Sequence, residues 1–182
     1  MLFSAGNIPN VITLLRIVLV PVFIRFILKG NYTAALWIFF AAGVSDALDG
    51  FIAKRFNFCT RLGAFLDPLA DKVLLISSVV VFARAGCLPT WLALTIIARD
   101  VVIVGGAGAF YLRSGRLDMA PSRASKLNTF VQICLIFALT LHLSGFAMVA
   151  VWLPTLFALT FAAAIVSGGH YVMVWGRKAD IL

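Results

Sequence analysis

Six long, continuous apolar runs constrain this chain more than any other feature of its sequence. They cover residues 11–28, 32–53, 65–84, 90–112, 127–144 and 147–174. Each is close to the ~20 residues that a helix needs to cross a bilayer, whereas strands of outer-membrane barrels alternate apolar and polar residues. With 63% hydrophobic and 12% charged residues, the chain also lies far from soluble composition. We expect an all-α, polytopic membrane bundle of six transmembrane helices, formed by residues 1–182 as a single integral-membrane domain.

The connections between the runs are short and rich in turn residues. They carry KGN at 29–31, a glycine and a proline at 86–89, and Ser-Gly at 144–145. Segment 1–10 precedes the first run and contains Gly, Asn and Pro. We expect this segment to lie along the membrane surface as a short interfacial helix.

The net charge of +8 is distributed in the way that orients membrane helices, which argues against nucleic acid as a partner. With a cytoplasmic N-terminus, only Lys29 and Arg84 lie at the opposite ends of the runs. The basic residues at the cytoplasmic ends are Lys54, Arg55, Arg61, Arg113, Arg116, Arg123, Lys126, Arg177 and Lys178. We therefore expect a multi-pass protein of the inner (cytoplasmic) membrane, surrounded by lipid, with its N-terminus on the cytoplasmic side.

Four of the seven acidic residues, all of them Asp, are concentrated in residues 46–71. Asp46 and Asp49 are three apart near the end of the second run, and Asp67 and Asp71 are four apart at the start of the third. Both spacings place side chains on one helix face, and the short turn predicts antiparallel neighbours whose carboxylates converge. An unpaired carboxylate in a span costs about 2.5–3.5 kcal/mol, so pairing with arginine or with cations is needed.

Two cations fit the four carboxylates better than arginine does. A structural ion pair with Arg16 or Arg99 would need one Asp and not four. Hard oxygen ligands favour Mg²⁺ or Mn²⁺. Two such ions about 3.5–4 Å apart suit phosphoryl transfer.

Small residues accompany the Asp pairs. Gly50 and Ala53 lie on the side of the first pair, and Gly63 precedes the second. Glycine lets a ligand approach the backbone closely, so this side could take a flat group such as a nucleobase. The turn supplies side chains that could meet phosphates: Lys54, Thr60 and Arg61.

The complete spacing, D-x2-D-G-x2-A-K-x8-G-x3-D-x3-D over residues 46–71, resembles the signature of the CDP-alcohol phosphatidyltransferase family. One position departs from it, because the family usually has arginine where this chain has Lys54. Lysine keeps the charge but lacks the bidentate fork that suits phosphate. Arg55, the next residue, is a candidate to compensate.

The resemblance implies a six-span membrane enzyme, commonly a homodimer, with its active site on the cytoplasmic side. Such enzymes move a phosphatidyl group from CDP-diacylglycerol to an alcohol and release CMP. Carried over, Asp46, Asp49, Asp67 and Asp71 bind two divalent ions, Mg²⁺ or Mn²⁺, and Asp71 is also the catalytic base. The residues assigned to CDP-diacylglycerol are Gly50, Ala53, Lys54, Thr60 and Gly63.

The opening sequence NIPNVITLLR at 7–16 also looks like the start of this family. Asn10, Thr13 and Arg16 follow one another at intervals of three residues, so they lie close to one face of a helix. We assign them to CDP-diacylglycerol as well, at its phosphate or pyrophosphate.

A second polar group lies around the start of the fifth run, in RASKLNTFVQ at 123–132. The positive end of a helix dipole and nearby cations would attract an acceptor that carries phosphate. The predicted acceptor-binding residues are Arg99, Arg113, Arg123 and Lys126.

Two acceptors compete. The family branch that makes phosphatidylglycerophosphate usually has G-K-x-K-T-x-x-Q here, whereas this chain has Ser125 and Asn128 in place of Gly and the second Lys. Eukaryotic-type cardiolipin synthases are similar to this chain at three places: the S-K-x-N-T form, ARD at 98–100 and the GRK tail at 176–178. We expect sn-glycerol 3-phosphate as acceptor, with phosphatidylglycerol as the alternative.

A function of another class, a divalent-cation carrier, would use the carboxylates as a transit site. It predicts acidic residues near both membrane surfaces, whereas the Asp cluster lies on one side.

Overall fold

The described part of the chain folds into six α-helices and one 3₁₀ helix. The computed structural model describes the backbone of residues 8–56, 61–114 and 123–179, and the side chains of 17–45, 72–106 and 123–174. The helices are α1 (Ile8–Leu28), α2 (Tyr32–Phe56), α3 (Arg61–Arg84), α4 (Thr90–Ser114), α5 (Arg123–Leu143), η2 (Ala147–Trp152) and α6 (Leu153–Ala179). The described ranges contain no strand. The six helices predicted from the apolar runs are therefore confirmed.

Two helix boundaries differ from the prediction. Residues 8–10 belong to α1 and not to a separate interfacial helix, while residues 1–7 lie outside the described part. The sixth run opens with η2, and α6 begins only at Leu153. Pro154 explains this start, because proline has no N–H to bond the carbonyl four residues earlier and is favoured in the first turn of a helix.

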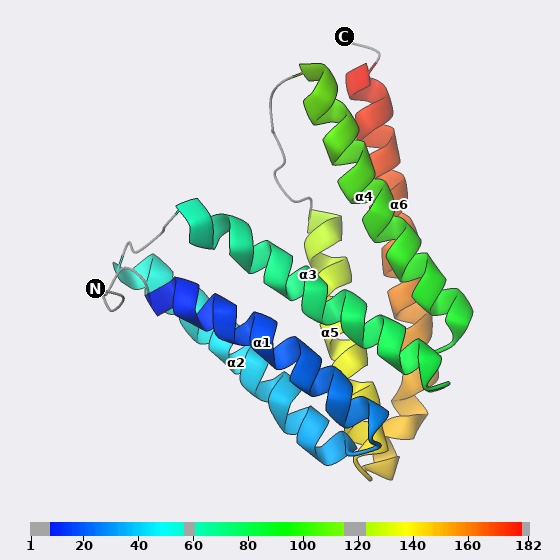
Figure 1. The fold of residues 1–182 in the computed structure, drawn as a ribbon. Coiled ribbons are helices and arrows are strands. Elements are labelled where there is room, and N and C mark those ends of the chain that lie inside the picture. The colour runs from blue at the N-terminus through cyan, green and yellow to red at the C-terminus, as the bar shows by residue number, and fades with distance from the viewer. Residues whose placement is uncertain (1–7, 57–60, 115–122, 180–182) are drawn as a thin grey trace.

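The helices form two groups that α5 connects (Figure 1). In the first group α1 packs against both α2 and α3. In the second, α6 packs against both α4 and α5. Helix α5 also contacts α2 and α3, and α4 contacts α3 less extensively than it contacts α6. Away from the 85–89 turn, α3 and α4 diverge from each other (Figure 1).

Glycine turns close one end of the bundle, which we call the turn end. After α1, Gly30 has φ +71°, and the N–H groups of Gly30 and Asn31 donate to the carbonyls of Ile27 and Phe26 at 3.0 Å each. Gly86 repeats this pattern after α3, with φ +72°. This is the Schellman arrangement, which needs a left-handed residue that only glycine adopts without strain. The predicted turns at 29–31 and 86–89 are confirmed.

An aromatic cluster fills the space where α1, α2 and α3 meet. Phe23 of α1 is completely buried, and its ring centroid lies 5.8 Å from that of Phe39 and 6.3 Å from that of Phe82. Tilted and edge-on pairs of this kind contribute about 0.5–1.5 kcal/mol beyond the area they bury. The first helix group is thus held by apolar packing.

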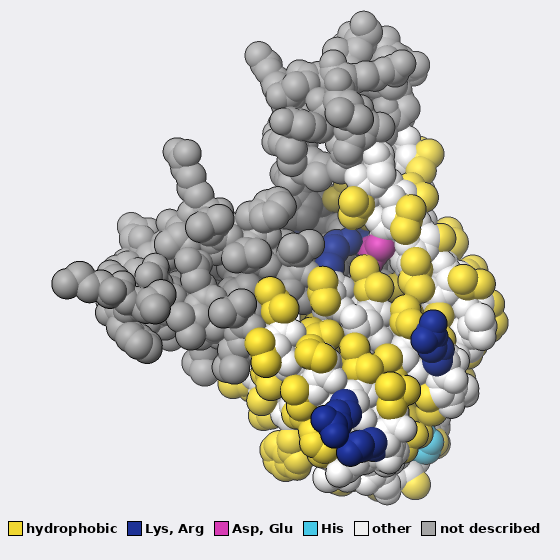
Figure 2. Space-filling view, viewed as in Figure 1, with side chains coloured by type: hydrophobic (Ala, Val, Ile, Leu, Met, Phe, Trp, Pro, Cys, Tyr) yellow, Lys and Arg dark blue, Asp and Glu magenta, His cyan; other side chains and the backbone are white. Residues whose placement is uncertain are grey.

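Apolar side chains also cover the outside of the described helices (Figure 2). Trp37, Leu94, Phe130 and Met173 are among the large hydrophobic residues that are more than half exposed. By length and composition, α5 and the stretch 147–174 can each cross a membrane, and the apolar stretches 17–28 and 32–45 are shorter. So large an exposed apolar surface indicates membrane association.

Candidate active site

The two Asp pairs fall on helices that are connected at the end opposite to the turn end. Asp46 and Asp49 belong to the last part of α2, and Asp67 and Asp71 to the first half of α3. The prediction that both Asp pairs lie on helices is confirmed. In a helix, residues three or four apart share one face, so each pair lies on one face of its helix. Their side chains lie outside the described residues, so the predicted metal cluster stays a prediction.

Helix α1 packs against both helices of the motif. Within the described ranges no Cα atom of α2 lies within 8 Å of a Cα atom of α3. The two helices are therefore not the direct neighbours that the short turn predicted, because each packs on α1 instead. They run in opposite directions, as predicted (Figure 1). Because α1 starts where α2 ends, the first turns of α1 come to the same end of the bundle as the Asp pairs.

The remaining predicted positions of the CDP-diacylglycerol site have no described side chains. Asn10, Thr13 and Arg16 belong to α1, Gly50, Ala53 and Lys54 to α2, and Gly63 to α3, while Thr60 lies outside the described backbone. Of the predicted acceptor-binding residues, Arg113 belongs to α4 without a described side chain. The side chains of Arg99, Arg123 and Lys126 are described.

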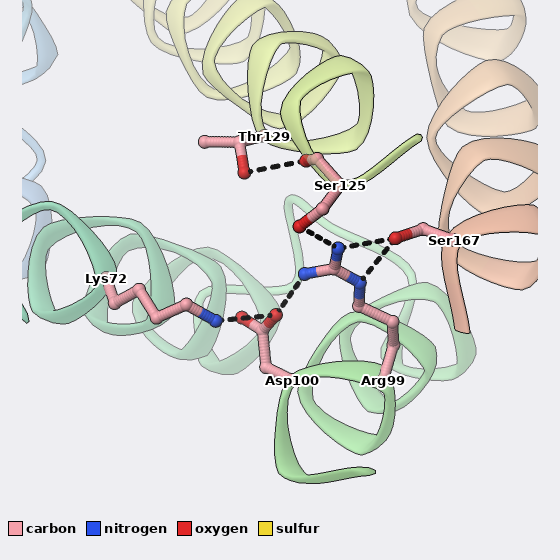
Figure 3. A network of polar contacts seen from close by, with 6 residues as sticks. All are labelled: Lys72, Arg99, Asp100, Ser125, Thr129 and Ser167. Atoms are coloured by element: carbon pink, nitrogen blue, oxygen red, sulfur yellow. Dashed lines mark hydrogen bonds and ion pairs between the residues drawn. The ribbon is translucent and has the colours of Figure 1, made fainter. Parts of the chain in front are cut away.

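Arg99 is the centre of a polar network that joins three helices (Figure 3). Its side chain is only 4% exposed. Nη1 donates to Asp100 at 2.6 Å, Nη2 donates to Ser125 of α5 at 2.8 Å, and both Nη2 and Nε donate to Ser167 of α6, at 2.5 and 3.2 Å. All three guanidinium nitrogens therefore have protein partners, and the buried charge has the hydrogen bonds that it needs.

Asp100 extends the network to α3. The same Oδ1 that binds Arg99 accepts from Lys72 Nζ at 3.1 Å. The Asp100 side chain is 10% exposed and that of Lys72 is 39% exposed. Asp100 is the only acidic residue with a described side chain, and Figure 3 shows its carboxylate between Lys72 and Arg99. The network thus touches α3, α4, α5 and α6.

The first turns of α5 present two kinds of polar side chain. Arg123 and Lys126 are exposed, so they are free to meet a ligand from the surrounding solution. Asn128 and Gln132 are buried, and the Asn128 amide and Gln132 Nε2 have no hydrogen-bond partner among the described residues. Thr129 instead donates to the carbonyl of Ser125 in its own helix, at 3.1 Å.

Comparison with known proteins decides the family. The model of the CDP-alcohol phosphatidyltransferase family matches residues 6–166. The chain belongs to this family. That range includes every Asp of the 46–71 motif and the whole Arg99 network except Ser167, so the motif stands in the context that the resemblance implied.

Relatives within the family carry two different names. A probable phosphatidylglycerophosphate synthase of Mycobacterium tuberculosis is 36% identical over 174 residues, which are 92% of this chain and 80% of that protein. The CDP-diacylglycerol–glycerol-3-phosphate 3-phosphatidyltransferase of Bacillus subtilis is 30% identical, over 91% of this chain and 93% of that protein. The CMP-forming cardiolipin synthase of Rattus norvegicus is 36% identical, over 94% of this chain and 62% of that protein. The chain is therefore a phosphatidyltransferase of phospholipid biosynthesis.

Sequence reasoning identified part of the Arg99 network and missed the rest. It identified Arg99, as a predicted acceptor-binding residue, and the structure adds the carboxylate of Asp100 and its second partner, Lys72. Ser167 was missed, because a serine inside an apolar helix has no distinguishing spacing. A lysine inside an apolar run was the available signal for Lys72, since such a charge needs a partner.

Proposed function

We propose that the protein transfers the phosphatidyl group of CDP-diacylglycerol to sn-glycerol 3-phosphate, forming phosphatidylglycerophosphate and CMP. The observation that carries this proposal is the complete Asp motif of residues 46–71 on α2 and α3, inside a family match over residues 6–166. Two relatives matched along most of their length have names that specify this reaction. Membership of an enzyme family also favours the transferase over a divalent-cation carrier.

We assign two Mg²⁺ or Mn²⁺ ions to Asp46, Asp49, Asp67 and Asp71. The donor set fits, because four carboxylates on two helices supply the hard oxygen ligands that these ions prefer. Bound there, the ions would neutralise the diphosphate and stabilise charge that develops on it.

Asp71 would act as the catalytic base. Its carboxylate accepts the proton of the acceptor hydroxyl, whose oxygen forms a bond to the phosphatidyl phosphorus. The bond from that phosphorus to the bridging oxygen of the diphosphate breaks, and CMP leaves with the electron pair. A positioned base of this kind contributes about 10²–10⁴-fold to the rate.

The substrate sites are assigned to the helices that meet at the end of the bundle opposite the turn end; this end carries the Asp motif, and we call it the motif end. Gly50, Ala53 and Gly63 would admit the nucleotide close to the backbone. The side chains proposed for its phosphates are Asn10, Thr13, Arg16, Lys54 and Thr60. The phosphate of the acceptor would bind Arg123 and Lys126, which are exposed at the start of α5, and we also assign Arg113, near the end of α4, to this acceptor.

Arg99 is set apart from these acceptor cations. All of its guanidinium nitrogens already donate to protein groups, and its side chain is buried. We therefore assign it to the framework of the acceptor site and not to direct contact with the acceptor phosphate.

Phosphatidylglycerol is the second candidate acceptor, and Asn128 is the observation that favours it. This position is a buried, neutral amide, so the start of α5 has fewer cations for a phosphate monoester. The rat relative whose name specifies cardiolipin synthesis is as similar as the mycobacterial relative. With this acceptor the product would be cardiolipin.

We further propose six membrane crossings, a homodimer, and an inner-membrane location with the N-terminus and the active site on the cytoplasmic side. In the full sequence, nine basic residues lie at the ends of the apolar runs on the side of the Asp motif, and only Lys29 and Arg84 lie at the opposite ends. This excess supports a cytoplasmic orientation of the end that carries the motif.

One assay tests the function and the acceptor together. Purified protein in detergent is incubated with CDP-diacylglycerol and Mg²⁺, with sn-glycerol 3-phosphate or phosphatidylglycerol, and CMP release is measured. We expect release with glycerol 3-phosphate, abolition by EDTA and restoration by Mn²⁺. Release with phosphatidylglycerol alone would select the alternative, and release with neither would contradict the proposal.

The base is tested by Asp71→Asn, which keeps the shape of the side chain and removes its basicity. We expect turnover to fall by about 10²–10⁴-fold. Asp118→Asn, at a carboxylate outside the motif, is the matched control and should keep wild-type turnover. Normal turnover of Asp71→Asn would remove the base assignment.

A further inference from the structure

The ion pair between Lys72 and Asp100 lies at the junction of the two helix groups. It joins α3, which carries Asp67 and Asp71, to α4, which packs mainly against α6. We infer that Lys72 and Asp100 are positioning residues: their ion pair fixes the rotation of α3 and thereby holds the Asp67 and Asp71 positions in place for phosphatidyl transfer. This inference rests on the proposed function of those two carboxylates.

Helix geometry connects Lys72 to the motif. Lys72 directly follows Asp71, and successive helix residues are rotated by about 100°. Positions 71 and 67 therefore lie about 100° and 140° around α3 from position 72. When Asp100 holds the Lys72 ammonium toward α4, it also fixes the direction in which the motif face of α3 points.

The start of α3 needs such an anchor because of its own sequence. Pro68 stands between the two motif positions and has no N–H to donate to the carbonyl of residue 64. The helix is therefore held less firmly by its backbone just before Lys72. Away from the 85–89 turn α3 also diverges from α4 (Figure 1), so a side-chain contact has to supply the constraint.

The anchor is rigid on the α4 side. Asp100 is tied to Arg99 at 2.6 Å, and Arg99 is tied to Ser125 of α5 and Ser167 of α6 (Figure 3). A carboxylate that is 10% exposed and shared by two cations has little freedom to follow α3. Lys72 is consequently fixed against three other helices and not against one flexible partner.

A direct substrate contact is the competing role for Lys72, since its ammonium carries three donors and is 39% exposed. The two roles differ in kinetics. A phosphate ligand mainly raises KM when it is removed, whereas a misplaced reacting group lowers kcat. A purely structural pair would lower thermal stability and leave the turnover of the folded protein unchanged.

The test uses the full chain in detergent and three variants. Lys72→Met removes the charge and keeps the length, Lys72→Arg restores the charge, and Asp100→Asn removes the carboxylate. Lys29→Met, an exposed lysine at the turn end, is the matched control. For each protein we would measure kcat, KM for both substrates and the thermal midpoint of unfolding. Mn²⁺ binding in the absence of substrate would be measured by electron paramagnetic resonance.

We expect Lys72→Met and Asp100→Asn each to lower kcat by about 10- to 100-fold, the size of a misplaced reacting group, with KM changed less than twofold. Mn²⁺ binding should weaken in both variants. Lys72→Arg and Lys29→Met should stay near wild type. The double variant should be no slower than the slower single one, because residues that act through one contact are not additive.

Three results would overturn the inference. The first is that folded Lys72→Met keeps wild-type kcat and wild-type Mn²⁺ binding. The second is that Lys72→Met raises KM but leaves kcat unchanged. The third is that the losses of kcat in Lys72→Met and Asp100→Asn multiply in the double variant. If the wild-type protein released no CMP, the proposed function would fail by itself. The Mn²⁺ measurement would then still show whether the pair controls a carboxylate site.

Discussion

The two helix groups share one apolar core but differ in the contact at the centre of each group. In α1, α2 and α3, this contact is the cluster of Phe23, Phe39 and Phe82, which contains no polar atom. In α4, α5 and α6, apolar packing is joined by the guanidinium of Arg99 with its hydrogen bonds to Ser125 and Ser167. The aromatic cluster tolerates small rotations at low cost, because dispersion is not directional. The Arg99 network accepts few geometries, because charge-assisted hydrogen bonds are directional.

This difference indicates that the two helix groups have different structural roles. A membrane bundle gains little from burying apolar surface away from lipid, so tight packing and polar contacts decide which helices associate. Directional contacts are placed where α4, α5 and α6 border the proposed acceptor site, and apolar packing is used near the turn end. Breaking each kind of contact should therefore give a different pattern of stability and activity.

Phe23→Ala should produce the largest loss of stability. Removing a fully buried phenylalanine costs about 3–5 kcal/mol in protein cores, and Phe23 touches both aromatic partners of the cluster. The thermal midpoint in detergent should fall strongly, while the turnover of the protein that remains folded stays near wild type. The midpoint is read from intrinsic fluorescence.

The control for this change is Phe130→Ala, because Phe130 is 63% exposed on α5 and fills no space in the core. Its midpoint should move little. Equal losses in both variants would contradict the view that the aromatic cluster, and not general apolar content, holds the first helix group.

The sequence was informative where a pattern repeats over many residues. Long apolar runs predicted all six helices, and the Asp spacing predicted the motif that α2 and α3 carry. The residues KGN predicted the turn at 29–31, and the structure adds how the turn is built: Gly30 is left-handed and the Asn31 side chain caps the next helix. Asn31 indeed accepts from the N–H of Ala34 at 3.1 Å.

The sequence was uninformative where a contact depends on helix rotation. Arg99 and Ser167 are 68 residues apart, and no local pattern selects one serine among several in apolar helices. Arg99 was predicted to bind the acceptor because a cation near a polar site is usually available. Only the structure shows that its donors face protein groups, since that depends on how α4 and α6 pack together.

Ser167→Ala should give an intermediate loss of stability. It removes one hydroxyl that accepts from two nitrogens of a buried guanidinium. Arg99 keeps its bonds to Asp100 and Ser125, so we expect a total cost of about 1.5–3 kcal/mol, the size of one hydrogen bond to a charged group. The thermal midpoint should fall by less than in Phe23→Ala. KM for the acceptor should rise in this variant, because Arg99 supports the framework of the acceptor site.

Ser78→Ala provides the matched control for Ser167→Ala. Ser78 is equally buried but donates only to the carbonyl of Leu74 in its own helix, at 2.7 Å. Its loss should change both midpoint and KM very little. If the two serine variants behaved alike, contacts between helices would be no more important than local ones in the second group.

Gly86→Ala should give the smallest loss, and it tests the turn that links the two groups. Gly86 has φ +72°, and an added Cβ would meet no atom within 4 Å, so only backbone strain of about 1–2 kcal/mol is expected. Gly105→Ala is the matched change inside α4, where an added Cβ also meets nothing. There alanine should stabilise by about 0.5–1 kcal/mol.

Opposite shifts of the thermal midpoint in the two variants would show that the left-handed turn, and not side-chain space, sets the cost at Gly86. Shifts of the same sign would mean that α3 and α4 can be joined by another backbone conformation, and the Lys72–Asp100 pair would then have to fix their relative position alone.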